Sequence, residues 1–184
     1  MIEESLATPQ LTSTTAILSS PVRELREFAE HPDAYLEDLF ANPEAAARTW
    51  LRMGEPHRFQ YNDGVVSLAW QGAPLLGAPV WDDVCGIWRG LVEVVADYSA
   101  TGRGETLLPD QPVSVVLEQI RGGALLRIGD AAVRVDPAVF NLELLAEAER
   151  FWQWTELHGI PVDAPGALTE ITRARTSLGL AAGL

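Results

Sequence analysis

The sequence predicts an α+β fold in a single domain, in which an antiparallel sheet, made of a hairpin and a three-strand meander, packs against several helices. Strand-like segments follow one another directly, without the intervening helices that parallel strands require. The helical segments are grouped before, between and after the two strand regions. The length of 184 residues is typical of one domain, and a hydrophobic content of 47% is sufficient for a packed core.

The domain is expected to span residues 19–184, with a different character before it. Residues 1–18 are mostly polar and end in the apolar stretch Ala16-Ile17-Leu18. They show no periodicity that decides their structure, so they are interpreted as either a flexible arm or an edge strand.

Prolines mark the starts of three short helices between residues 20 and 54. Pro21, Pro32 and Pro43 each follow a residue that can precede a helix, and proline is favoured in the first turn because no N–H is needed there. Pro32 and Pro43 interrupt what would otherwise be a longer helix. Apolar residues recur at helical spacing through the region, and Gly54 is a suitable C-terminal cap.

The next region changes to strand-like alternation. Asp63-Gly64 is a strong signal for a hairpin turn, and it separates the strand-like residues 58–61 from residues 65–70. Residues 71–80 are rich in proline and glycine and are interpreted as a loop.

A longer helix is predicted after this loop. Either Asp82 or Asp83 can cap it, and a stripe of apolar residues continues to about Tyr98. Residues 102–112 are interpreted as a loop that contains a short strand at 106–108.

The clearest prediction concerns the stretch from residue 113 to residue 158. Glycine turns separate three alternating segments, at residues 113–121, 124–128 and 131–135. Asp136-Pro137 then starts a helix that runs to His158 and is expected to cover the meander. A last helix is predicted at residues 167–178.

The sequence contains no recognisable catalytic or metal-binding motif. His31, His57 and His158 are far apart, and none lies in a His-Glu-x-x-His spacing. Cys85 stands alone, which rules out a cysteine-based zinc site. No serine lies in a Gly-x-Ser-x-Gly turn. We therefore expect no catalytic residues, no cofactor and no metal.

Neighbouring carboxylates are the remaining candidates for acid–base chemistry or for binding Mg²⁺. The pairs are Asp82-Asp83, Glu37-Asp38, and Glu147 with Glu149. Adjacent residues on a helix diverge by about 100°, so such pairs seldom converge on one ion. Asp82-Asp83 is more simply interpreted as a helix start.

Negative charge is the strongest compositional signal. The chain has 26 acidic residues against 13 arginines and no lysine, for a net charge of -13 at pH 7. Such a surface repels nucleic acids and anionic membranes and attracts basic partners. The absence of lysine excludes a Schiff-base or P-loop lysine. The competing interpretation is that the charge only maintains solubility.

The acidic residues are concentrated between residues 23 and 44, a stretch that contains seven acidic residues and two arginines. Glu24, Glu27 and Glu30 recur every three residues and are expected on one side of a helix. Trp81, next to acidic residues, is a candidate anchor for a partner. The predicted protein-binding residues are Glu24, Glu27, Glu30, Asp33, Glu37, Asp38, Trp81, Asp82 and Asp83. The competing interpretation is a solvated acidic face and a tryptophan packed in the core.

Two of the six tryptophans, Trp152 and Trp154, are two residues apart on a predicted helix. Residues at this spacing do not face the same way. One is therefore expected in the core, and the other nearer the surface or under a neighbouring segment.

In size and charge, though not through a motif, the chain resembles small bacterial immunity and inhibitor proteins. The resemblance implies a non-catalytic module, an inhibitor, immunity or adaptor protein, that binds a basic protein partner. The alternatives are a structural subunit that forms a homo-oligomer, and an enzyme with a motif-free carboxylate site. A cytoplasmic location is expected, because the N-terminus is acidic where a signal peptide would be basic, and because no apolar run approaches about 18 residues.

Overall fold

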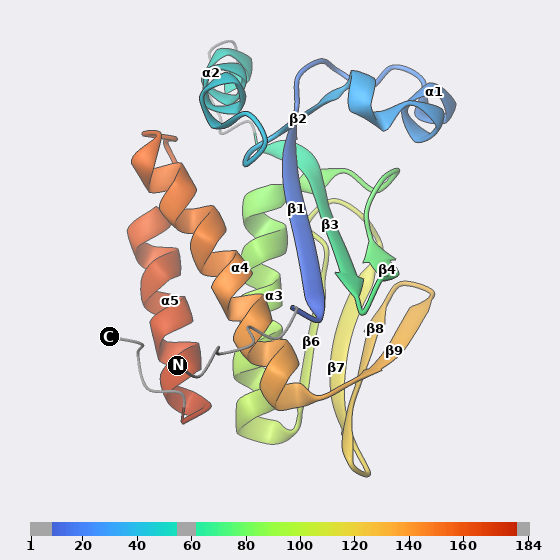
Figure 1. Cartoon of the computed structure of the whole chain (residues 1–184), viewed down its shortest axis with the longest axis vertical. Coiled ribbons are helices and arrows are strands. Elements are labelled where there is room, and N and C mark those ends of the chain that lie inside the picture. Colours follow the sequence, from blue (N-terminus) through green and yellow to red (C-terminus); the bar gives the residue numbers. More distant parts are fainter. Residues whose placement is uncertain (1–8, 55–61, 180–184) are drawn as a thin grey trace, which may run out of the picture.

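The computed structural model describes residues 9–54 and 62–179, and over these residues the chain is an α+β fold, as predicted (Figure 1). It contains two antiparallel sheets where the sequence predicted one. In the first sheet the strand order is β2 (Leu36–Asp38), β1 (Leu11–Leu18), β3 (Asp63–Trp70) and β4 (Ala73–Leu76), and β5 (Asp82–Asp83) also pairs with β3. In the second sheet the order is β6 (Arg103–Leu107), β7 (Ser114–Ile120), β8 (Gly123–Ile128) and β9 (Ala131–Val135).

The helices lie on the left side and along the top of Figure 1, with most of the strands at the right. They are α1 (Leu25–Glu30), a 3₁₀ turn η1 (Pro32–Ala34), α2 (Pro43–Gly54), α3 (Val84–Thr101), α4 (Pro137–Leu157) and α5 (Ala164–Ser177). The helices α3, α4 and α5 pack against one another. None of the helices in the described parts of the chain has the length and apolar character needed to cross a membrane.

The helix α3 is the centre of the molecule. It contacts β3 and β5 of the first sheet, β6 and β7 of the second, and the helices α4 and α5. Its apolar residues are buried around most of its circumference, as expected for a helix that is covered on several sides. The indole Nε1 of Trp88 on α3 donates a hydrogen bond to Oγ1 of Thr15 on β1, at 3.1 Å.

An aromatic cluster joins α2, α3 and α4 in the core. The ring of Phe151 lies 6.3 Å from Trp50, 6.0 Å from Trp88 and 4.9 Å from Trp152, measured between centroids. Trp154 stacks on Trp50 at 6.0 Å, so it is buried as well as Trp152. Trp152 therefore lies in the core, and Trp154 lies under the neighbouring helix α2, which is one of the two positions expected for the second tryptophan.

The predicted three-strand meander is present as β7, β8 and β9. Val115 lies opposite Ile128, and Leu117 lies opposite Leu126, so these side chains share one buried face. The helix that packs against this meander is α3, however, and not α4 as predicted. Because α3 already occupies that position, α4 packs on α3, α5 and β1 instead.

The capping predictions for the long helices are confirmed. Asp83 caps α3 by accepting a hydrogen bond from the N–H of Cys85 at 2.9 Å, and Asp136 caps α4 through the N–H of Ala138 at the same distance. The predicted loop at residues 102–112 begins with strand β6, which is longer than expected and starts earlier.

Three predictions in the N-terminal half are corrected. Residues 11–18 form the strand β1, which pairs with β3 over residues 11–17 and with β2 over residues 16–18, so it lies inside the sheet and not at its edge. Residues 1–8 of the predicted arm or edge strand lie outside the described residues. The predicted helices after Pro21 and Pro32 are reduced to the short α1 and η1. Residues 36–38, predicted as part of the helix after Pro32, form the strand β2. Their backbone N–H and C=O groups find hydrogen-bond partners by pairing with residues 16–18.

Asp63-Gly64 is not a turn but the beginning of β3, paired with β1 and with β5. Glycine is needed at this position because a Cβ atom on Gly64 would collide with the carbonyl oxygen of Ala16. The hairpin turn is at Gln71-Gly72, where φ is +50° and +81°, and it leads into β4 inside the predicted 71–80 loop. The other predicted strand, residues 58–61, lies outside the described residues.

Truncation of the central aromatic ring should strongly destabilise the fold. We expect Phe151→Ala to lower the free energy of unfolding by about 3–5 kcal/mol, because the ring is fully buried and its removal leaves a cavity. Urea unfolding followed by tryptophan fluorescence measures the change. Leu157→Ala, on the same helix but 81% exposed, is the control and should change stability by less than about 0.5 kcal/mol.

Candidate functional site

The first candidate site is the layer formed by α1 and η1 over one end of the first sheet (Figure 1). A small apolar cluster holds this layer in place. The ring of Phe28, fully buried, meets Tyr35 edge-on at 5.7 Å and Trp81 edge-on at 5.4 Å. Leu18 and Val65 from the sheet complete the cluster. The layer is therefore packed on the sheet through aromatic contacts.

The acidic residues of this layer remain at the surface. Glu24, Glu27, Glu30 and Asp33 are all exposed, and Leu25 between them is 57% exposed. We call these five residues the α1 surface. Arg26 forms an ion pair with Glu30 at 2.8 Å. Burial, and then the neighbouring carboxylates of Glu27 and Glu24, raise the pKa of the Tyr35 phenol.

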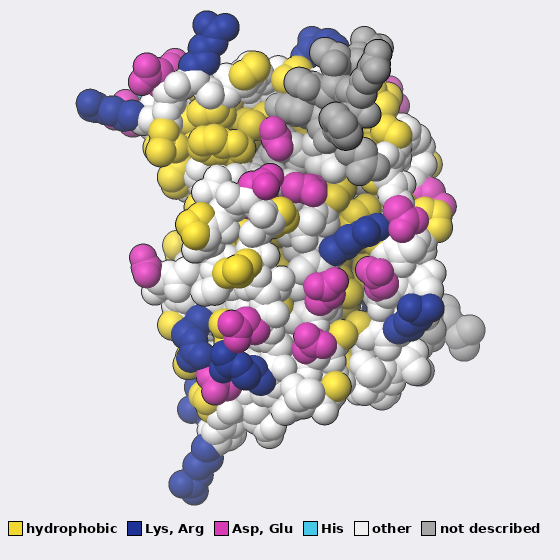
Figure 2. Space-filling view, turned by 180° about the vertical axis from the view of Figure 1, so that it is seen from behind, with side chains coloured by type: hydrophobic (Ala, Val, Ile, Leu, Met, Phe, Trp, Pro, Cys, Tyr) yellow, Lys and Arg dark blue, Asp and Glu magenta, His cyan; other side chains and the backbone are white. Residues whose placement is uncertain are grey.

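On other faces of the molecule several acidic side chains lie beside arginines. Figure 2 shows acidic and basic side chains lying next to one another over the middle and lower parts of the face seen from behind. On the second sheet, Glu118 pairs with Arg127 at 2.7 Å and with Arg103 at 3.4 Å. These arginines lower the pKa of Glu118, chiefly through the hydrogen bond from Arg127.

Glu37 and Asp38 lie on β2, half-buried and next to the α1 surface in the chain. Successive residues of a strand point to opposite faces, so these two carboxylates diverge. Oδ1 of Asp38 accepts hydrogen bonds from the N–H groups of Phe40 and Ala41, at 2.7 and 2.8 Å. Asp38 therefore stabilises the turn that leads into α2.

Trp81, Asp82 and Asp83 are structural in their contacts. Trp81 is half-buried against Phe28, and Asp83 caps α3. Asp82 is 2% exposed, and its carboxylate accepts hydrogen bonds from the N–H groups of Asp83, Asp110 and Gln111 at 2.7–3.1 Å. Burial raises the pKa of Asp82, although the hydrogen bonds oppose the shift.

The other carboxylate pair considered for chemistry is also engaged within the fold. Glu147 accepts a hydrogen bond from Ser13 and pairs with Arg150 at 2.9 Å. Glu149 pairs with Arg175 at 2.7 Å. The two carboxylates are therefore held apart by different partners and do not form one site.

The described parts of the chain contain no group of three side chains that could hold a metal ion. His31 is exposed, His158 stacks on Trp154 at 4.4 Å, and His57 lies outside the described residues. Cys85 is buried, and burial raises the pKa of its thiol well above the ordinary value.

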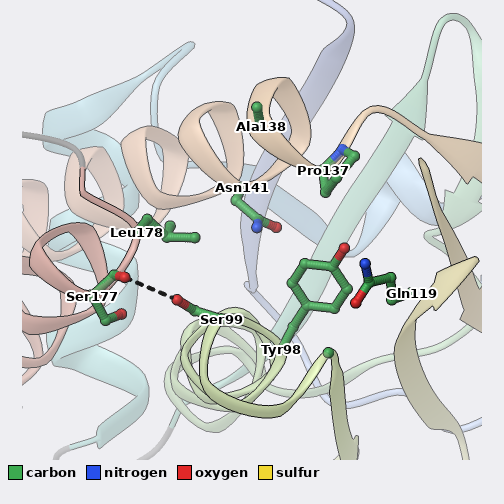
Figure 3. A pocket seen from close by; sticks show the side chains of 9 residues that line it. Tyr98, Ser99, Gln119, Pro137, Ala138, Asn141, Ser177 and Leu178 are labelled. Atoms are coloured by element: carbon green, nitrogen blue, oxygen red, sulfur yellow. Dashed lines mark hydrogen bonds between the residues drawn. The ribbon is translucent and has the colours of Figure 1, made fainter. Parts of the chain in front are cut away.

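A second candidate site was missed by the sequence analysis. A cavity of about 420 Å³ lies where the C-terminal ends of α3 and α5 meet the first turn of α4 and the strand β7 (Figure 3). We call it the α3–α5 pocket. The residues that line it are Tyr98, Ser99, Gly102, Gln119, Pro137, Ala138, Asn141, Ser177 and Leu178. One signal in the sequence pointed to it: Asn141 is a carboxamide among the apolar residues of the buried α4 face.

Comparisons with protein-family models, with curated proteins and with solved structures found no match. The interpretation of both sites therefore depends on their own geometry and chemistry.

Removal of the buried Asp82 carboxylate should weaken the fold. We expect Asp82→Ala to lower the free energy of unfolding by about 1–3 kcal/mol, because the N–H groups of Asp110 and Gln111 lose their acceptor. Urea unfolding measures the loss.

This loss should depend on pH. A carboxyl with a raised pKa binds its proton more tightly in the folded chain, so its contribution to stability grows as pH falls through the folded pKa. We expect the difference in stability between wild type and Asp82→Ala to increase from neutral pH towards the ordinary aspartate value of 3.8. A difference that shrinks over this range would contradict the assignment.

Proposed function

We propose that this chain is a non-catalytic protein-interaction module, an inhibitor, immunity or adaptor protein, whose α1 surface binds a basic protein partner. The observation that carries the proposal is the exposed acidic cluster of Glu24, Glu27 and Asp33, for which the described residues supply no ion pair with arginine. A basic partner would provide the missing counter-charges.

The composition of the α1 surface fits an interface as well as a solvated face. Leu25 exposes an apolar side chain between Glu24 and Arg26, and exposed apolar groups surrounded by charge are typical of the centres of binding surfaces. The rim of acidic groups would contribute chiefly to the rate of encounter and to the choice of partner.

The packing beneath the surface supports the same proposal. Phe28 is fixed between Tyr35 and Trp81, so α1 is attached to the sheet although it is only six residues long. A helix of this length is not stable alone in water. Its attachment in advance reduces the ordering that a partner would otherwise have to impose on binding.

Capture from the native host tests the proposal with two charge-matched variants. The test variant carries Glu24→Gln, Glu27→Gln and Asp33→Asn. The control variant carries Glu93→Gln, Asp97→Asn and Glu170→Gln, which removes the same charge from exposed positions on α3 and α5. We expect wild type and control to recover the same basic protein, identified by mass spectrometry, and the test variant to lose it.

Association kinetics with the captured protein provide the second measurement. The association rate of wild type should fall as salt rises, because the Debye length shrinks from about 10 Å at 0.1 M to about 3 Å at 1 M. The test variant should associate more slowly and depend less on salt than the control variant. Equal rates for the two variants would reduce the acidic cluster to a solubility feature.

A further inference from the structure

The α3–α5 pocket contains a buried polar group without a partner. Asn141 is 1% exposed, and its side-chain Oδ1 has no hydrogen-bond partner in the parts of the chain that the structure describes. Figure 3 shows its carboxamide projecting from α4 into the pocket, across from Tyr98 on α3. Buried polar groups are nearly always hydrogen-bonded, because an unpaired one loses its water without compensation. A ligand or an ordered water in the pocket can supply the donor that this oxygen lacks.

The other polar groups of the pocket are uncharged. They are the hydroxyls of Tyr98, Ser99 and Ser177 and the carboxamide of Gln119, and among the described residues no acidic, arginine or histidine side chain lines the cavity. The Ser99 hydroxyl donates to the carbonyl oxygen of Ser177 at 3.1 Å, and the Ser177 hydroxyl donates to that of Ala174 at 2.8 Å, which leaves the Tyr98 hydroxyl and the Gln119 carboxamide for a ligand. Burial raises the pKa of Tyr98, so its phenol is a neutral donor at physiological pH. A charged ligand would lose its hydration on entering the pocket and would find no opposite charge there, so its binding is disfavoured.

The rest of the lining is apolar and in part flat. In Figure 3 the ring of Tyr98 lies below Pro137 and to the right of Leu178. An aromatic ring of this kind offers a face on which a planar group can stack. The volume of about 420 Å³ is within the range of small-molecule sites.

We propose that the α3–α5 pocket binds an uncharged, planar cyclic amide, of the kind found in nucleobases and lactams. The ligand stacks on the ring of Tyr98, and its adjacent N–H and C=O groups pair with the carboxamide of Asn141. A carboxamide presents one donor and one acceptor side by side, so it matches an edge that carries the complementary pair. Gln119 lies next to the Tyr98 hydroxyl and can bond a second edge of the ring.

The test uses uracil and hypoxanthine as probes and orotate, the carboxylate of uracil, as the charged comparison. Each is titrated into the ¹⁵N-labelled full chain, and the side-chain amide of Asn141 is followed by NMR. We expect one or both neutral probes to shift this signal in a saturable way. Orotate should bind at least about tenfold more weakly than uracil, since none of the described residues that line the pocket carries a positive charge.

Two variants separate binding from folding. Asn141→Leu removes the carboxamide and keeps a similar side-chain size. It should lower the affinity for the probe at least about tenfold without lowering the melting temperature of the chain. Asn62→Leu is the matched control, because Asn62 is also buried with an unpartnered Oδ1 but does not line the pocket. This control should bind the probe as wild type does.

Three results would overturn the proposal: no shift of Asn141 with either neutral probe, equal binding by Asn141→Leu and wild type, or orotate binding as tightly as uracil. None of them bears on the α1 surface, which shares no residue with the pocket.

Discussion

The packing of one helix between two sheets and two further helices is the constraint on which the rest of the structure depends. Both sheets need a cover for their apolar faces, and α3 supplies it for each of them. This is why nine of its residues, from Val84 to Val95, are buried. With α3 in the centre, the helices α4 and α5 form an outer layer, and the aromatic ring of Phe151 fills the junction between the layers.

The same arrangement explains where functional surfaces remain. A chain that commits so many of its apolar residues to one core leaves few at the surface, and Leu25 on α1 is one of them. The α1 layer is the part of the described chain with its own small apolar cluster, separate from the main core. Its acidic groups are therefore carried by an element that packs outside the main core.

Local signals made part of this fold predictable from the sequence. The glycine turns of the meander and the caps Asp83 and Asp136 act within a few residues, so the sequence alone identifies them. The first sheet depends on contacts between distant segments. Residues 36–38 form a strand because they pair with residues 16–18. The sequence Asp63-Gly64 is typical of a turn, but here the glycine allows the backbone of β3 to lie close to Ala16. Such tertiary effects override local propensity.

The candidate sites follow the same division. The acidic positions of the α1 surface could be predicted, because charge is visible in the sequence, whereas the burial of Asp82 and the contact of Trp81 with Phe28 could not. The α3–α5 pocket is assembled from three helices and one strand, so no contiguous motif records it. Only Asn141 departs from the pattern around it, as a polar residue on an apolar helix face.

The two sites lie near opposite ends of α3, and this separation bears on how each can be studied. Trp81, just before the helix, contacts the α1 layer, and Tyr98, near its other end, lines the pocket. A helix of 18 residues is about 27 Å long. Substitutions at sites more than about 10 Å apart that share no partners are usually additive. Because α3 is held on several sides by packed side chains, it fixes the distance between the two surfaces. A change at one of them should therefore leave the chemistry of the other intact.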